Sequence, residues 1–149
     1  MKRLFQYILM GIALGFVIIQ FFQIDKSAPS FKPENDFLAV EEVDERTQLI
    51  LKEACYDCHS NETVYPWYTS VQPIAWRVAE HIEHGREHLN FSDWGMLPKS
   101  EKKHAIHEIV EVMEEGEMPL KDYTLVHAEA RLTKEDQNHL IQFVKGLKY

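Results

Sequence analysis

The sequence predicts an all-α protein, with one apolar N-terminal helix followed by a small helical domain that has long aromatic-rich loops. Two observations carry this prediction. The chain begins with a long uncharged apolar run, and later segments place apolar residues at helical spacing while none shows the alternation of a strand. A chain of 149 residues has room for one domain. We therefore divide it into an apolar helix (1–24), a tether (25–42) and a folded domain (43–149).

The first segment has the properties of a membrane anchor. Leu4 to Phe22 holds 19 residues and no charge, enough for a helix to cross a hydrocarbon core about 30 Å thick. Lys2 and Arg3 precede it, so the positive-inside rule predicts a single-pass inner-membrane protein with its C-terminal domain in the periplasm. A cleaved signal peptide is the alternative, but the bulky residues of 20–26 make a poor cleavage site. In either case the domain is exported.

Asp25 to Glu42 carries two prolines and scattered charge without helical periodicity, which indicates a tether. The domain that follows is predicted to contain about four helices, within 43–55, 73–90, 100–116 and 133–146. Asp44 and Ser100 are candidate N-caps, and Thr133 with Asp136 forms a variant capping box. Gly116 is expected to end the third helix.

The charge of the exported part is strongly acidic. From Gln23 onward, 14 lysines and arginines face 24 aspartates and glutamates, a balance of −10. Such a surface repels phosphate backbones, so we expect no nucleic-acid partner. It favours a protein partner with a basic docking patch.

Two irregular stretches, 59–72 and 91–99, are rich in aromatic side chains. Small helical domains rarely need such loops. They are explained if a large, flat, apolar group lies between the helices.

The central motif is Cys55-Tyr56-Asp57-Cys58-His59, a C-x-x-C-H sequence typical of c-type haem attachment. Two thiols on one helical turn can form thioethers with the two vinyl groups of one haem, and His59 then reaches the iron as proximal ligand. Three alternatives are weaker. A thioredoxin-like pair lacks its βαβ context, a zinc site lacks a second ligand pair, and a disulfide across so small a loop would add little stability.

The sequence from Cys55 to Trp94, the later Gly116-Glu-Met-Pro-Leu120 and a Leu-Thr-x-Glu start to the last helix resemble the bacterial haem-binding domain family. The resemblance covers about Leu51 to Lys148. It implies a membrane-anchored protein with a single haem c at the C-x-x-C-H site. The family is defined by that motif, so the resemblance implies no particular physiological role.

Met118 is the preferred sixth ligand of the iron. It is followed by Pro119 on a loop between two helices, which resembles the distal ligand of class I cytochromes c and predicts a cytochrome c-like domain. Met96 is a weaker rival. A histidine of the second helix could replace it, the candidates being His81, His84 and His88. An open sixth site is the remaining alternative.

Further residues are expected around the haem. Three aromatic side chains are candidates for packing on the macrocycle: Trp67, Tyr68 and Trp76. Arg86, and also Arg77, could pair with the propionates. The second ring nitrogen of His59 should donate to a backbone carbonyl, with 65–66 as a candidate source.

These features predict one-electron transfer by an electron carrier rather than an enzyme. A haem-based sensor with an open sixth site is the alternative. A haem peroxidase is less favoured, because no acid–base pair is evident beside the distal loop.

Overall fold

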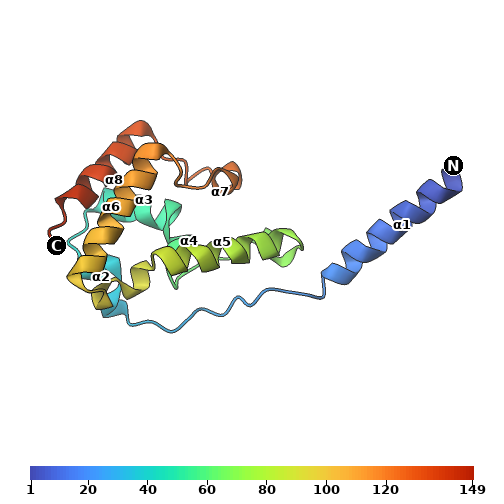
Figure 1. Cartoon of the computed structure of the whole chain (residues 1–149), viewed down its shortest axis with the longest axis horizontal. Helices are drawn as coiled ribbons and strands as arrows, with labels where there is room; N and C mark the ends of the chain where they lie inside the picture. Colours follow the sequence, from blue (N-terminus) through green and yellow to red (C-terminus); the bar gives the residue numbers. More distant parts are fainter.

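A computed structural model describes all residues, 1–149, and contains helices but no strands, which confirms the all-α prediction. Figure 1 shows α1 standing apart from the remaining helices, joined to them by an extended segment. The α-helices are α1 (Lys2–Ile19), α2 (Phe37–Val40), α3 (Glu45–Ala54), α4 (Tyr56–His59), α5 (Ile74–His88), α6 (Lys99–Glu115), α7 (Lys121–Val126) and α8 (Lys134–Gly146). Three 3-10 helices join them: η1 (Pro33–Asn35), η2 (Trp67–Ser70) and η3 (Phe91–Met96).

Helix α1 buries none of its residues against the domain. It is the one helix whose length and apolar composition would suit a membrane crossing, a property that it shares with signal sequences. Its large apolar side chains are exposed from Leu4 to Ile18, so the domain does not cover them.

The segment predicted as a tether is only partly extended. Its second half forms η1 and α2, and Phe37 is 1% exposed in the core. The neighbouring Asp36 caps α2 and accepts a hydrogen bond from the Tyr56 hydroxyl at 2.8 Å. Asp36 and Phe37, within the segment predicted as a tether, are therefore packed on the domain. The sequence did not indicate this, because a four-residue helix is too short to show periodicity.

The core forms where α3, α6 and α8 pack together and α2 closes one side against η3. Phe37 contacts Phe91 and Trp94 edge-to-face, with ring centroids 5.2 and 5.0 Å apart. Phe91 and Trp94 are thus core residues, which differs from the expectation that both aromatic loops face a flat group.

Most predicted helix ends are confirmed. The Asp44 carboxylate accepts from the Thr47 N–H, and Thr133 and Asp136 form the capping box. Gly116 ends α6 in the left-handed region with φ of 71°. The expected cap at Ser100 is wrong, because α6 begins at Lys99 after Pro98 and has no side-chain cap.

Candidate functional site

The C-x-x-C-H motif occupies a single helical turn between α3 and α5. Cys55 ends α3 and begins α4, and its carbonyl accepts from the His59 N–H at 2.9 Å. This hydrogen bond closes the turn and holds both thiols and the imidazole on one short segment. Neither cysteine forms a disulfide.

Helix α5 holds this turn in place through a close backbone approach. A Cβ atom on Gly85 would lie 2.7 Å from the Cys58 carbonyl oxygen, closer than packed atoms allow. The absence of a side chain at Gly85 therefore lets α5 pack directly on the backbone of the motif.

The end of α5 also orients His59. The Nδ1 atom of His59 lies 3.0 Å from the Leu89 carbonyl oxygen. Because a carbonyl oxygen can only accept a hydrogen bond, Nδ1 carries the proton and Nε2 has the free lone pair. Burial is the main cause that lowers the pKa of His59, which keeps the ring neutral. A backbone carbonyl was expected in this role, but it comes from Leu89 and not from 65–66.

The two thiols are kept protonated by their surroundings. Burial raises the pKa of Cys55 to about 12 and that of Cys58 to about 11. Redox-active C-x-x-C pairs have the opposite property, a lowered thiol pKa. The electrostatics therefore argue against thiol–disulfide exchange at this motif.

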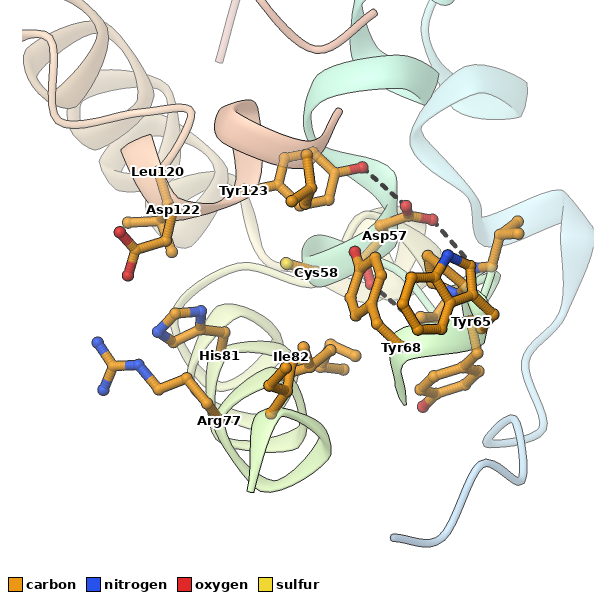
Figure 2. Close-up of a pocket in the computed structure, with 17 residues that line it drawn as sticks. Asp57, Cys58, Tyr65, Tyr68, Arg77, His81, Ile82, Leu120, Asp122 and Tyr123 are labelled. Carbon is orange, nitrogen blue, oxygen red and sulfur yellow. Dashed lines mark hydrogen bonds between the residues drawn. The ribbon is translucent and has the colours of Figure 1, made fainter. Parts of the chain in front are cut away.

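A cavity of about 330 Å³ opens beside Cys58, between α5, η2 and α7. Figure 2 shows the Cys58 sulfur between His81 and Ile82 on α5 and Leu120 and Tyr123 at α7. Eleven of the 17 lining residues are hydrophobic. The cavity is thus an apolar slot with a thiol at its inner wall.

Hydroxyl groups at the cavity wall belong to a hydrogen-bonded network. The Tyr123 hydroxyl donates to the Asp57 carboxylate at 2.7 Å (Figure 2), and the Tyr68 hydroxyl lies 2.6 Å from His127 Nε2. His127 Nδ1 lies 2.7 Å from a Glu129 carboxylate oxygen, so it carries the proton and Nε2 accepts from Tyr68. Burial, with the bond to Asp57, raises the pKa of Tyr123.

This hydrogen-bonded network was not predicted from the sequence. Tyr123 and Val126 lie on a six-residue helix, too short for apolar spacing to identify it. No motif links Tyr68 to His127, 59 positions along the chain. Only the packing of α7 beside η2 brings them together.

Comparison with known proteins gives one match. The sequence model of a family described as a haem-binding domain matches residues 14–146. The chain belongs to the haem-binding domain family. The match includes the C-x-x-C-H turn and every residue of the cavity, and it identifies haem as the cofactor. No curated protein and no solved structure matches the chain.

The residues of this haem-binding domain fit the group. The cavity volume falls within the roughly 300–1,000 Å³ typical of cofactor sites, and its lining is mainly apolar. His59 has a neutral ring with a free Nε2, the form in which imidazole binds iron. Both thiols are free. Of the motif, Asp57 and Cys58 line the cavity, whereas Cys55 and His59 lie outside the lining. The donor types and the apolar cavity beside Cys58 agree with a haem-binding site.

Two of the predicted aromatic contacts lie in the cavity wall and one does not. Trp67 and Tyr68 line it, both from η2. Trp76 lies outside the lining, and its indole N–H donates to the Phe22 carbonyl at 2.9 Å. The side chain of Trp76 thus faces the end of α1, and its contact with haem stays a prediction.

Arg86, the expected partner of a haem propionate, is hydrogen-bonded to the loop that follows the motif. Its Nε donates to the Ser60 carbonyl at 2.7 Å and its second nitrogen to the Thr63 hydroxyl at 2.8 Å. These bonds fix the loop after the motif and leave Arg86 outside the cavity lining. Arg77 lines the cavity, so it remains the candidate partner for the haem carboxylates.

The candidate sixth ligands differ in position. Met118 is half-buried and packs against the core, while Leu120, two residues later, lines the cavity. Among the histidines of α5, His81 lines the cavity, whereas His84 and His88 are exposed. Of the three histidine candidates, His81 is the one that lines the cavity, and the identity of the sixth ligand stays a prediction.

Proposed function

We propose that this haem-binding domain carries one covalently attached haem c and transfers single electrons. The observation that carries the proposal is the C-x-x-C-H turn, on which His59 is held as the Nδ1–H tautomer by the Leu89 carbonyl. Addition of the Cys55 and Cys58 S–H groups across the two vinyl groups would give two thioethers, with no oxidant required.

The chain's own residues hold the group and exclude water. His59 presents Nε2 to the iron, and the Leu89 carbonyl, by accepting from Nδ1–H, strengthens that nitrogen as a ligand. The apolar wall of α5 and α7 keeps the site dry, and Arg77 at its edge suits a carboxylate. A haem held by these residues would supply the redox chemistry, which would be the exchange of single electrons between a donor and an acceptor protein.

Met118 is proposed as the sixth ligand. The left-handed Gly116 frees the backbone before it and Pro119 restricts the backbone after it, so the thioether can be held at one position. Paired with His59, a thioether raises the reduction potential and closes the iron to other ligands. His81 is the rival, because it already lines the cavity.

We also propose that α1 is an uncleaved anchor and that the domain lies on the periplasmic side of the inner membrane. The support is the apolar, fully exposed α1 and the two basic residues that begin it, Lys2 and Arg3. An electron carrier held there would meet partners at the membrane surface. The acidic domain favours a partner with a basic patch.

Mass and spectrum test the proposal. Denatured protein matured in a c-type host should retain the mass of one haem, while Cys55→Ser with Cys58→Ser should lose it. Release of free haem by the wild type would contradict covalent attachment.

The ligand set is tested by absorption. Loss of a methionine-to-ferric charge-transfer band in Met118→Ala, but not in Met96→Ala, supports Met118. Loss of low-spin character in His81→Ala instead would assign His81. A high-spin ferric spectrum, with rapid carbon monoxide binding after reduction, would contradict both and the electron carrier with them.

That last outcome would favour the second candidate, a haem-based sensor. One observation supports it: Met118 packs on the core while hydroxyl groups of Tyr68 and Tyr123 stand at the cavity wall. An open iron in such a cavity could bind a small diatomic ligand.

A further inference from the structure

The side of the domain nearest α1 carries apolar side chains that the core leaves uncovered. Trp67 is 81% exposed and Val64 71%, and Ile74 and Trp76 are also largely exposed. We call these four residues the aromatic rim. Scattered exposed apolar residues are ordinary, but Val64, Trp67 and Ile74 gather at the edge of one cavity.

The end of α1 is hydrogen-bonded to this same side of the domain. Gln20 Nε2 donates to the Gln72 carbonyl at 3.1 Å, and the Gln72 N–H donates to Gln20 Oε1 at 2.9 Å. Trp76 adds its bond to the Phe22 carbonyl. These hydrogen bonds place the rim beside the C-terminal end of α1. Figure 1 shows this end of α1 close to the start of α5.

From this arrangement we infer that the aromatic rim lies in the interfacial layer of the membrane that α1 crosses, so that the cavity opens at the lipid surface. The inference rests on the proposed anchor. Tryptophan is enriched at this depth because its ring is apolar and its N–H still finds an acceptor, as that of Trp76 does here. A membrane is therefore the occupant that fits both the chemistry of the rim and its position.

The end of α7 adds to this apolar surface. Leu125 and Val126 are exposed, and Val126 lines the cavity. The next residue, His127, lies beside η2, with Nε2 2.6 Å from the Tyr68 hydroxyl. A flat apolar surface that covers the rim would extend to these side chains.

Charge indicates how the rim is held. The exported part has a balance of −10, which anionic lipids repel. Attraction must therefore come from burial of apolar area, which salt does not screen. Lys26, hydrogen-bonded to the Ser70 hydroxyl at 2.8 Å, adds one cation at headgroup level.

Site-directed spin labelling tests this arrangement. The full haem-loaded chain is reconstituted in phosphatidylcholine vesicles with a nitroxide at Val64→Cys in the rim. The matched control is Leu49→Cys, an exposed apolar position on α3, and Ala13→Cys in α1 reports the anchor. Collision with oxygen, which enters lipid, is compared with collision with a water-soluble nickel chelate.

We expect the ratio of oxygen to nickel collisions at Val64 to exceed that at Leu49 several-fold, in 1 M KCl as in low salt. Trp76→Ser should lower the ratio at Val64, while Leu49→Ser should not. Equal ratios at Val64 and Leu49, with the Ala13 label in lipid, would overturn the rim alone. A water-exposed Ala13 label would instead overturn the anchor.

Two further outcomes also contradict the inference. Loss of the lipid signal at Val64 in high salt would mean electrostatic adsorption. Dipolar broadening at Val64 that disappears when unlabelled protein is added would mean that a second copy of the chain covers the rim.

Discussion

Gly85 is where helix α5 lies closest to the C-x-x-C-H turn. Its missing side chain allows contact with the Cys58 carbonyl, and the obstacle to any Cβ is backbone, which cannot rotate away. We expect Gly85→Ala to cost about 1–3 kcal/mol of the free energy of unfolding, the usual range for overpacking. Urea unfolding measures this loss. Haem content per protein should also fall, because α5 carries the Leu89 carbonyl that orients His59.

Gly146→Ala is the matched control, since nothing lies within 4 Å of a Cβ at that helical position. It should be neutral or stabilise by up to about 1 kcal/mol, because alanine loses less backbone entropy than glycine in a helix. Equal stability and haem content in the two variants would contradict a role for Gly85 in positioning the motif.

At the scale of elements, the N-cap of α3 makes the helix that precedes the motif pH-sensitive. Hydrogen bonds from the Thr47 hydroxyl and N–H lower the pKa of Asp44 from 3.8 to about 2. A lowered folded-state pKa stabilises the fold above the unfolded pKa, and that contribution is lost as pH falls from about 4 toward 2. Removing Asp44 should therefore matter at neutral pH and not in strong acid.

Asp44→Ala should cost about 1 kcal/mol at pH 7, the typical cost of a lost cap, and the difference from wild type should shrink below pH 4. Denaturant unfolding at several pH values measures this. Glu42→Ala, a nearby exposed acid without a capping bond, is the control. If the difference in unfolding free energy between Asp44→Ala and the wild type stayed constant down to pH 2, the ionised Asp44 carboxylate would not be the stabilising cap.

The short helix α2 depends on a single side chain for its place in the domain. Phe37 packs among Phe91, Trp94 and Phe143. Phe37→Ala should cost about 3–5 kcal/mol, the range for a buried phenylalanine. Val40→Ala, on the same helix but exposed, should cost much less. Proteolysis within 25–42 would report α2 detaching, and resistance equal to wild type would show that α2 is held by other contacts.

These elements show what a sequence can predict. Long helices with polar caps were identified because their spacing and caps are local: Asp44, Thr133 and Gly116 each act within four residues. The C-x-x-C-H motif is equally local. By contrast, α2 and α7 have too few residues for periodicity, and their positions depend on contacts with distant segments.

The same difference between local and long-range contacts explains which residues of the site could be predicted from the sequence. Cys55, Cys58 and His59 come from one turn, so sequence alone identifies them. Other hydrogen bonds of the site join residues 23 to 59 positions apart in the sequence. They are those from His59 to Leu89, Tyr68 to His127, Trp76 to Phe22 and Arg86 to Thr63. Aromatic and basic residue types indicated a pocket, but not which of them point into it.

At the scale of the whole molecule, charge and apolar surface are separated along the chain. Helix α1, whose apolar side chains are exposed, lies at one end of the molecule (Figure 1), and its C-terminal end is hydrogen-bonded beside the aromatic rim. From Gln23 onward the charge balance is −10. A field of this sign draws cations to the domain and repels anions. It reaches about 30 Å at 0.01 M ionic strength and about 8 Å at 0.15 M.

Electron exchange with small redox reagents tests this field without a known partner. Oxidation of the reduced domain by the cation tris(phenanthroline)cobalt(III) should be fast in low salt and slow as ionic strength rises, because screening removes the attraction. Oxidation by the ferricyanide anion should show the opposite slope. Stopped-flow absorption of the haem measures both. Charge-reversing substitutions at two acids of α6, the half-buried Glu108 and the exposed Glu111, should flatten both slopes. The two are combined as Glu108→Lys with Glu111→Lys, whereas Lys103→Arg, which keeps the charge, should change neither slope. Reversed slopes, with the cation reacting faster and ferricyanide slower as ionic strength rises, would mean that local positive charge at the cavity edge, where Arg77 lies, outweighs the net charge. A basic partner would then gain no speed from the acidic domain.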